Sequence, residues 1–505
     1  MKKYLLGIDV GTSAVKAACF TEDFRLVAYE SAEYPIYFCG DNKVEQEPEE
    51  WWDATVRSIN KIAAAIKGEG EIKAVSVSSQ SPALIPIGRD GKAVRRAMIW
   101  MDRRAQAECD YAVYNLIGYE RYKKILRSEP DAYYVLPKIL WYRKNEPENY
   151  EKTVMYLQVN GYINFKLTGE YSLDLIHAVA TNGMDYEKRA WSDEISGLTG
   201  VPFSELFPEI SQPYEIIGKV TKQAAELTGL AEGTPVVAGV TDTIASYYGC
   251  GVLSEKSSAE MTGTSSIMFF NLNKTLDDYG KMMVKPSPFD RNSNILVAAI
   301  NSSGASVEWF RKVFASGPDI PLDYDTFNNE AATAEPGSGK VIWFPYLSGE
   351  RSPLFNSFAR GMYIGMNSST GRPELARAVL EGTSYAIRHN FDEARSLGAA
   401  PEYAVACGGG AKSHIWLKIK ASVLGIPLKV FENETIDRAT LGDAMLAGYG
   451  VGMVDDVRKT SQQVCRFSKV VEPDAEWSRI YNDLYALYRK MYVHLEDDLK
   501  ELSLI

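Results

Sequence analysis

The sequence predicts an α/β protein built from a duplicated unit, and three observations carry this prediction. Strand-like and helix-like segments alternate in both halves of the chain. Each half contains a Gly-Thr-Ser turn after a strand, at residues 11–13 and 263–265. The length of 505 residues exceeds what one ordinary hydrophobic core supports. We therefore expect two domains, residues 1–247 and 248–505, with a cleft between them.

The first half is expected to contain five strands, at residues 4–8, 14–20, 25–29, 72–78 and 97–100. Short apolar runs bounded by turn residues predict each of them. A helix is expected to begin at Pro48, because proline suits the first helical position and two glutamates follow it. Residues 105–230 are mostly helical in pattern and rich in tyrosine, and they indicate no particular chemistry.

The second half repeats this organisation. A strand over 235–240 leads to the expected boundary, and the second Gly-Thr-Ser turn lies between the runs SAEMT and SSIMFF. The expected strand at 295–300 is followed by helices over 304–314 and 373–398. Residues 402–413, EYAVACGGGAKS, predict a strand, a glycine loop and the start of a helix.

The composition excludes several classes of function. A net charge of −11 argues against nucleic acid or an anionic membrane as the main partner. The six cysteines include no C-x-x-C pair and the four histidines lack metal-ligand spacing, which argues against disulfides and zinc. No apolar stretch approaches 18 residues, and Asp9 interrupts the first apolar run. We therefore expect no membrane span, no signal peptide and a cytoplasmic location.

The paired turns indicate a phosphate site. Glycine lets the backbone approach a ligand, successive N–H groups bind anions, and Thr and Ser add hydroxyl donors. The alternative is two β-hairpins that simply require glycine; the pairing, and Asp9 just before Gly11, weigh against it. The sequence lacks G-x-x-x-x-G-K-[ST], and no G-x-G-x-x-G follows a strand, which disfavours a P-loop ATPase and a dinucleotide dehydrogenase. Glycines 408–410 would admit a nucleoside, or form only a tight loop.

Several polar residues follow predicted strands. Asp9 stands where a Mg²⁺-organising carboxylate would be useful, and its alternative role is a turn or cap. Asp242 follows VVAGV and opens a helix, so it could accept a proton from an alcohol; its alternative role is an N-cap. Trp100, Asp102 and Arg103 in WMDRR would suit a polyhydroxylated ligand, or form only a strand end with an ion pair.

Together these motifs resemble the FGGY carbohydrate kinases of the actin-like ATPase superfamily, and they are most similar to the xylulokinase branch. The matching stretches run through nearly the whole chain: GIDVGTSAVKAACF, VEQEPEEWW, AMIWMDRRA, VVAGVTDTIASYYG, MTGTSS, FPYLSGERSP, ELARAVLEGTSYAI and CGGGAKS. The resemblance implies two ribonuclease-H-like domains with an interdomain catalytic cleft, ATP and Mg²⁺ as cofactors and, more weakly, a homodimer.

The resemblance also assigns roles to residues. Asp242 would be the catalytic base, and Asp9 would organise Mg²⁺ largely through water. ATP is expected on Asp9, Gly11, Thr12, Ser13, Lys16, Gly263, Thr264, Ser265, Gly304, Gly408, Gly409, Gly410, Ala411 and Lys412. The sugar is expected on Gln80, Ser81, Trp100, Asp102, Arg103, Asp242 and Thr243.

One loop departs from the xylulokinase pattern. Xylulokinases usually carry Gln-Met-His-Gly where they contact the sugar, whereas this chain continues from Gln80 with Ser81-Pro82-Ala83. The missing histidine removes a hydrogen-bonding group from the expected sugar site, and such a loss can change selectivity by orders of magnitude. The resemblance therefore supports kinase chemistry more strongly than it supports D-xylulose as the substrate.

The predicted reaction is transfer of the ATP γ-phosphoryl group to a primary hydroxyl of an open-chain sugar. A ketopentose such as D-xylulose is the first candidate, with gluconate, L-ribulose or another ketose or polyol as alternatives. Two alternatives from other classes are a non-enzymatic actin-like nucleotide-binding protein and a pseudokinase that only binds a metabolite.

Overall fold

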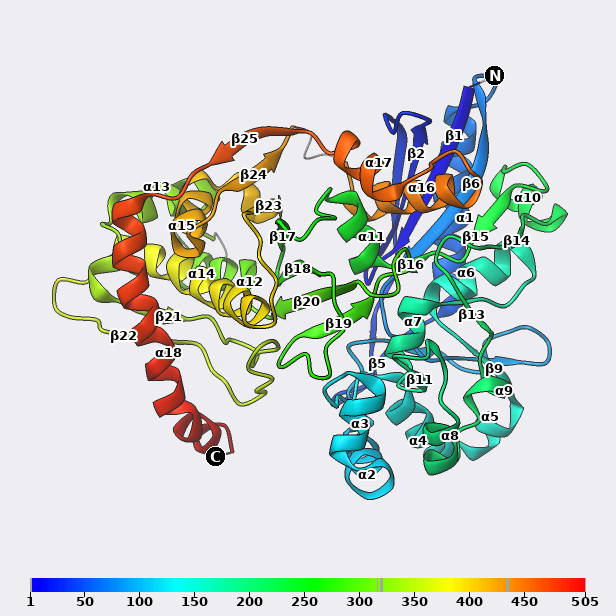
Figure 1. Ribbon diagram of the computed structural model, residues 1–505, viewed down its shortest axis with the longest axis horizontal. Coiled ribbons are helices and arrows are strands. Elements are labelled where there is room, and N and C mark those ends of the chain that lie inside the picture. The colour runs from blue at the N-terminus through cyan, green and yellow to red at the C-terminus, as the bar shows by residue number, and fades with distance from the viewer. Residues whose placement is uncertain (1, 316, 318–320, 433–435, 505) are drawn as a thin grey trace. The chain divides into compact units, whose positions relative to one another are not determined.

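The computed structural model describes residues 2–315, 317, 321–432 and 436–504. They form two compact units that each combine helices with a central sheet (Figure 1). The first unit comprises 1–251, 285–291 and 435–465, and the second comprises 252–284, 292–434 and 466–505. The units thus differ from the contiguous division 1–247 and 248–505, because two segments of the second half fold with the first unit. No helix among the described residues combines the length and apolar composition of a membrane span.

The central sheet of the first unit has the strand order β14-β15-β6-β1-β2-β3, with β16 paired to β6. Its strands are β1 (Lys2–Val10), β2 (Ala14–Thr21), β3 (Leu26–Glu33), β6 (Gly70–Ser79), β14 (Ile216–Lys219), β15 (Pro235–Val237) and β16 (Val240–Thr241). The main helices against it are α1 (Pro48–Ala65), α11 (Asp242–Gly249) and α16 (Arg438–Gly450). β1 runs antiparallel to β2 and parallel to β6, so the turn 11–13 and the end of β6 lie side by side.

Alternate residues of β1 face different helices, as the two-residue repeat of a strand requires. Leu6 and Ile8 pack in one apolar cluster with Trp51 of α1. Gly7 lies instead against α16, since a Cβ at Gly7 would meet the carbonyl oxygen of Thr440 at 2.0 Å. Figure 1 shows α16 beside β1, β2 and β6, although it comes from the last part of the chain. Asp9 lies two residues after Gly7 in the same strand, so its side chain points to the same face of the sheet, the face that α16 covers.

Glycines explain why α16 belongs to the first unit. A Cβ at Gly442 of α16 would meet the carbonyl oxygen of Ala245 in α11 at 1.9 Å. A Cβ at Gly249 of α11 would meet the carbonyl oxygen of Arg438 at 2.0 Å. The backbones of the two helices therefore approach each other at distances that no side chain permits. This packing ties residues 435–465 to the first unit.

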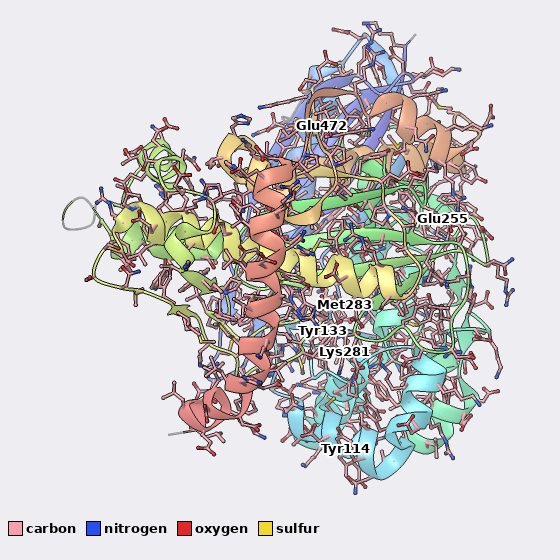
Figure 2. The ribbon with its side chains drawn as sticks, turned by 60° about the vertical axis from the view of Figure 1, so that its left-hand side comes forward. Tyr114, Tyr133, Glu255, Lys281, Met283 and Glu472 are labelled. Atoms are coloured by element: carbon pink, nitrogen blue, oxygen red, sulfur yellow. The ribbon has the colours of Figure 1, made fainter. Side chains whose placement is uncertain are left out.

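The rest of the first unit is mostly helical, as its sequence predicts. The helices are α2 (Gln106–Tyr111), a π-helical turn (Ala112–Ile117), α3 (Tyr119–Leu126), α4 (Val135–Asn145), α5 (Pro147–Lys152), α6 (Val159–Thr168), α7 (Leu175–Ala180), α8 (Asp193–Thr199), α9 (Phe203–Leu206), α10 (Lys222–Thr228) and α17 (Val457–Val464). The short strands are β4 (Tyr37–Phe38), β5 (Val44–Gln46), β7 (Ile85–Gly88), β8 (Ala97–Met98), β9 (Thr153–Leu157), β10 (Leu173–Asp174), β11 (Met184–Asp185), β12 (Ala190–Trp191) and β13 (Ile210–Ser211). Tyr114, in the π-helical turn, is exposed at the outer edge of these helices (Figure 2).

Two expected strands of the first unit differ from the structure. The strand expected over 97–100 is reduced to the two residues of β8, because the chain turns at Ile99, whose carbonyl accepts a hydrogen bond from the Asp102 N–H at 3.0 Å. The strand expected over 235–240 is divided into β15 and β16. Gly239 separates them with φ +78, and a Cβ there would meet the carbonyl oxygen of Val77 at 1.9 Å.

The sheet of the second unit repeats the first. Its order is β19-β20-β18-β17-β23-β24-β25. The strands are β17 (Ser257–Thr262), β18 (Ser266–Leu272), β19 (Met283–Pro286), β20 (Asn294–Ile300), β23 (Tyr403–Gly408), β24 (Leu428–Phe431) and β25 (Phe467–Val471). β17 is antiparallel to β18 and parallel to β23, as β1 is to β2 and β6. The predicted duplication is therefore present in strand order and strand direction.

Helices surround this second sheet. They are α12 (Gly304–Val313), α13 (Tyr324–Thr333), α14 (Arg372–Ser396), α15 (His414–Leu424), α18 (Ala475–Leu504) and two 3₁₀ turns, Ser338–Lys340 and Gly409–Lys412. A two-stranded sheet, β21 (Ile342–Phe344) and β22 (Met362–Ile364), packs with them. Tyr481 of α18 donates a hydrogen bond to Glu381 of α14 at 2.9 Å, and Glu381 also pairs with Arg377 at 2.7 Å. These buried contacts fix α18 against α14.

The glycine contact between α16 and α11 can be tested by adding one methyl group. Gly442→Ala should lower the free energy of unfolding by about 2 kcal/mol or more, because the new Cβ overlaps the Ala245 carbonyl. Gly197→Ala in α8 is the matched control, since a Cβ there meets no atom within 4 Å and should stabilise the helix by about 0.5–1 kcal/mol. Thermal unfolding of both variants checks this. Equal midpoints would contradict the packing.

Candidate active site

The first Gly-Thr-Ser turn is held in place from three sides. The Gly11 N–H donates to the Ala14 carbonyl at 3.1 Å. Gln46 Nε2 donates to the Thr12 carbonyl at 2.8 Å, and the Trp100 indole N–H donates to Thr12 Oγ1 at 2.9 Å. Ser13 is exposed. The structure therefore connects Trp100 to the turn that the sequence assigned to phosphate, while its predicted stacking on a sugar stays a prediction.

A row of polar side chains crosses the sheet on the α16 face. Asp9 of β1 lies opposite Lys16 of β2 and beside Ser78 of β6. Lys16 Nζ lies 3.3 Å from Asp9 Oδ2 and 2.9 Å from Asp437 Oδ2. Asp437 is the N-cap of α16, and its Oδ1 accepts a hydrogen bond from the Thr440 N–H at 3.0 Å. One ammonium thus serves two carboxylates.

Asp9 keeps one oxygen unused. Its Oδ1 is buried and has no hydrogen-bond partner among the described residues. Burial raises the pKa of Asp9 to about 7; Lys16 opposes the shift, and the charges of Asp437 and Asp242 add to it. Burial alone would lower the pKa of Lys16, but the two carboxylates outweigh it and raise that pKa. An unpaired carboxylate oxygen is a suitable ligand for Mg²⁺ or for water bound to it.

Asp443 is a second buried carboxylate under the same row. It accepts hydrogen bonds from Ser76 Oγ at 3.1 Å and Ser78 Oγ at 2.6 Å. Burial raises its pKa well above the usual range, and the charges of Asp9 and Asp437 add to the shift. Asp443 therefore joins α16 to β6 through the hydrogen bonds that it accepts from the two serine hydroxyls.

Asp242 occupies the first position of α11, directly after β16. Thr241 is the N-cap, and Asp242 Oδ1 accepts hydrogen bonds from the Thr243 N–H at 2.6 Å and the Thr243 hydroxyl at 3.0 Å. Oδ2 of Asp242 makes no hydrogen bond within the described part of the chain. The side chain is half-buried, and burial raises its pKa although the Thr243 bonds oppose the shift. A carboxylate with one free oxygen and a raised pKa suits a general base.

Most of the predicted sugar residues fall into two groups, one at the end of β6 and one in the WMDRR motif. Gln80 is buried at the end of β6; its Nε2 donates to Gln46 Oε1 at 2.7 Å, and its Oε1 has no partner among the described residues. Ser81 follows it and is half-buried. Asp102 is fully buried, and both its oxygens accept from the Arg104 guanidinium at 2.7–3.0 Å, while its Oδ1 also accepts from the Arg104 backbone N–H at 3.1 Å. A direct contact of Asp102 with sugar would have to disturb that ion pair.

Arg103 is also engaged. Its guanidinium pairs with Asp131 and lies over the ring of Tyr133. The sequence motif WMDRR therefore supplies Asp102 and Arg103 to separate ion pairs. Their assignment to the sugar stays a prediction.

The second Gly-Thr-Ser turn sits against the start of α12. The Gly304 N–H donates to the Gly263 carbonyl at 3.1 Å, and the Ala305 N–H donates to the Thr264 carbonyl at 2.9 Å. A Cβ at Gly304 would meet the Gly263 oxygen at 2.3 Å, so only glycine allows this approach. The sequence placed Gly304 in the nucleotide site, and the structure puts it directly against the turn.

The glycine loop 408–412 reaches the same turn from the neighbouring strand. Gly408 lies opposite Thr262 in the parallel pairing of β23 with β17. Gly408 has φ +76, and a Cβ there would meet the Thr262 carbonyl at 2.5 Å. Gly409 and Lys412 are exposed, and Gly410 and Ala411 are buried. In the second unit the two predicted nucleotide segments therefore adjoin.

A buried ion pair supports the second turn. Lys420 of α15 donates to Glu260 Oε2 at 2.6 Å and to Thr262 Oγ1 at 2.5 Å. Ser266 Oγ donates to Glu260 Oε1 at 2.8 Å. Thr262 and Ser266 flank the turn, so Glu260 and Lys420 fix both of its ends. No local pattern in the sequence indicates this pair, because its two residues lie 160 positions apart.

Sequence reasoning also missed Asp437, Asp443 and a His177–Asp174 pair. His177 Nδ1 lies 2.5 Å from Asp174 Oδ2, and both side chains are fully buried. The i,i+3 spacing and the N-cap position of Asp174 were visible in the sequence, but they indicated only a helix start. Within the described part of the chain, no group of three or more His, Cys, Asp or Glu side chains has the arrangement of a metal site.

Comparisons with known proteins give the family. Residues 4–249 match the N-terminal domain, and residues 259–451 the C-terminal domain, of the FGGY family of carbohydrate kinases. The chain is 28% identical over 497 residues to xylulose kinase of Bacillus subtilis (strain 168), covering 98% of each. It is also 28% identical over 514 residues to gluconokinase of the same strain, again covering 98% of each. A crystal structure of ligand-bound xylulose kinase from Lactobacillus acidophilus has a TM-score of 0.92 at 25% identity, covering 99% of this chain and 100% of that one.

The raised pKa of Asp9 makes a stability prediction. The folded-state pKa of about 7 exceeds the value of about 3.9 expected on unfolding, so ionisation favours the unfolded chain increasingly from about pH 4 to pH 7. Asp9→Asn should therefore raise the unfolding midpoint of the unliganded protein by several degrees at pH 8 and by less at pH 5. The exposed control Asp41→Asn should change it little at either pH. A gain for Asp9→Asn that is larger at pH 5 than at pH 8 would contradict the assignment.

Proposed function

Because the chain belongs to the FGGY family of carbohydrate kinases, we propose that it transfers the γ-phosphoryl group of ATP to a primary hydroxyl of an open-chain sugar. The observation that carries the proposal is Asp242, a half-buried carboxylate with a raised pKa and one free oxygen at the end of β16. Such a group can take the hydroxyl proton as the oxygen attacks phosphorus. Asp242 is therefore the proposed catalytic base.

The nucleotide is assigned to the two turns. Backbone N–H groups and hydroxyls of Gly11–Ser13 and of Gly263–Ser265 would bind phosphate oxygens, and Gly408–Lys412 would lie along the adenosine. Lys16, paired with Asp9 and Asp437, supplies a positive charge on β2, the strand that follows the first turn. Gly304 contributes by letting α12 begin directly on the second turn.

Mg²⁺ fits the donor set that the first unit offers. Mg²⁺ usually keeps several waters and takes one or two carboxylates together with substrate phosphates, so it needs no closed protein cage. Asp9, with its unpartnered Oδ1, would hold it, and Asp437 would lie nearby. When bound, the ion would neutralise phosphate charge and position the transferred group. Lys16 would keep Asp9 oriented.

The proposed acceptor is an open-chain sugar. The similarity to known kinases does not decide whether that sugar is a ketose or a sugar acid. Relatives of equal identity are a xylulose kinase and a gluconokinase. D-xylulose is the first candidate by family resemblance, and gluconate, L-ribulose and other ketoses or polyols are the alternatives. A screen of ADP release over pentuloses, hexuloses, aldonates and polyols tests the function. ATP binding without ADP release on any acceptor would favour the pseudokinase or the non-enzymatic actin-like alternative.

Replacing the base should separate chemistry from binding. Asp242→Asn should lower kcat by about 10²–10⁴-fold, because the amide cannot accept the hydroxyl proton, and should leave the ATP dissociation constant within a few-fold. Asp193→Asn is the matched control, since Asp193 also holds the first position of a helix but is exposed. Steady-state ADP release and ATP titration measure both quantities. Loss of ATP binding in Asp242→Asn would count against the role.

The second turn can be tested through Gly304. Gly304→Ala should raise the KM for ATP by about tenfold or more, because the added Cβ overlaps the Gly263 carbonyl and displaces the turn from α12. Gly197→Ala is the control, because the methyl group that it adds meets no atom within 4 Å. Gly452→Ala would not serve as a control, because Gly452 has a positive φ that disfavours any side chain. An unchanged KM for ATP in folded Gly304→Ala would remove the second turn from the nucleotide site.

A further inference from the structure

Gln46 connects two parts of the proposed active site. It is the last residue of β5 and is fully buried. Its Nε2 donates to the Thr12 carbonyl at 2.8 Å and to the Pro35 carbonyl at 3.2 Å. Its Oε1 accepts a hydrogen bond from Gln80 Nε2 at 2.7 Å. One side chain therefore contacts both the first Gly-Thr-Ser turn and a residue assigned to the sugar.

Two backbone carbonyl groups determine which way the Gln46 amide points. A carbonyl oxygen only accepts hydrogen bonds, so the end of the amide that faces Thr12 and Pro35 must be the NH₂ group. The oxygen of Gln46 then faces Gln80, and the end of the Gln80 amide that meets it must again be an NH₂ group. The backbone thus sets the orientation of two side-chain amides in succession.

Gln80 Oε1 is the atom that this succession leaves over. Gln80 is 1% exposed, and its Oε1 is buried without a hydrogen-bond partner among the described residues. Leaving a buried acceptor unsatisfied is costly, so an acceptor of this kind in a proposed binding site indicates a ligand that supplies the donor. Because the amide cannot turn over without losing the bond to Gln46, the ligand group that fits is a hydroxyl.

The Thr12 hydroxyl is oriented in the same way at the other end of the network. The Trp100 indole N–H, which can only donate, lies 2.9 Å from Thr12 Oγ1. The Thr12 oxygen therefore accepts from Trp100, and its hydrogen points elsewhere, since no described residue accepts it. A hydroxyl with a free hydrogen is the group that a phosphate oxygen can accept from.

Main-chain contacts place Gln80 beside the first turn and beside the proposed base. The Gln80 N–H donates to the Val10 carbonyl at 2.9 Å, and Val10 directly precedes the turn. β16 pairs in parallel with β6 through Thr241 and Ser79. The residues that follow this pair, Asp242 and Gln80, therefore leave the same edge of the sheet.

We propose that Gln46 is a positioning residue of the phosphoryl-transfer site. It holds Gln80 so that Gln80 Oε1 accepts a hydrogen bond from a hydroxyl of the sugar, and it holds the turn so that Thr12 donates to a phosphate oxygen. This inference rests on the proposed kinase function and adds a link between its two substrates. The amide of Gln46 is already used by Thr12, Pro35 and Gln80, so Gln46 acts on the sugar only through Gln80.

A double-mutant cycle tests whether Gln46 acts through Gln80. The acceptor used is the one with the highest wild-type kcat/KM for ADP release among D-xylulose, L-ribulose, D-gluconate and xylitol. Gln80→Met should lower this kcat/KM by about 10- to 100-fold, because a buried hydroxyl loses its partner. Gln46→Met should lower it by about tenfold in the wild-type background, but by less than about twofold in the Gln80→Met background.

The turn end of the network has a separate readout. Gln46→Met should raise the dissociation constant of Mg·ATP, titrated without sugar, by about three- to tenfold, because the Thr12 carbonyl loses its donor. Gln80→Met should change that constant by less than about twofold. Gln106→Met is the control for both measurements and should alter neither, since Gln106 is exposed and donates to Asp110 within α2.

The outcomes distinguish this inference from the kinase function. Losses that multiply in the double variant would indicate a general structural role for Gln46, and they would overturn the inference while the kinase function stands. An unchanged kcat/KM in Gln80→Met would overturn it as well. Gln46→Leu takes the place of Gln46→Met if thermal unfolding shows that the latter does not fold. Absence of wild-type ADP release with all four compounds would instead contradict the proposed function, and the inference with it.

Discussion

The ion pairs of Lys16 with Asp9 and Asp437 are the constraint on which the rest of the site depends. Lys16 and Asp9 face each other across the β1–β2 hairpin, so the pair fixes the strand ends that enter the turn 11–13. Asp437 joins from the N-terminus of α16, and Asp443, six residues further along the chain in that helix, accepts hydrogen bonds from β6. Turn, sheet and helix are therefore positioned by polar contacts that link the two strands, β6 and α16.

Close backbone packing makes those polar contacts possible. Gly7 and Gly442 let α16 approach β1 and α11 at distances that a Cβ would prevent. A more distant helix would leave Asp437 out of reach of Lys16 and would hydrate Asp9, whose raised pKa depends on burial. The second unit uses the same device at Gly304 and Gly408, which bring α12 and the glycine loop against the second turn. Both turns are thus shaped by contacts of main chain with main chain.

The sequence predicted the parts of the site that are local. A turn following a strand, an aspartate opening a helix and a glycine loop are encoded within about ten residues, so Asp9, Asp242 and Gly408 could be named. Asp437 could not, because it meets Lys16 across 421 residues and only the packing of α16 brings them together. Residues 285–291 could not be assigned to the first unit for the same reason, because Arg189 and Phe289 hold them there through contacts between residues that are distant in sequence. The duplicated strand order was predictable because both halves repeat the same alternation of strands and helices.

The balance of charge in the first unit limits how it can bind a nucleotide. Asp9, Asp242 and Asp437 lie close enough to affect one another electrostatically, and Lys16 is already shared between two of them. A polyphosphate approaching this cluster would meet net negative charge, in a chain whose overall charge is −11. Backbone N–H groups can bind phosphate without a net charge, so the nearby carboxylates do not neutralise them. A bound divalent cation would make the local charge positive. Glycine turns and an aspartate that keeps one oxygen unpaired are consequently the arrangement through which we propose that this acidic protein binds ATP.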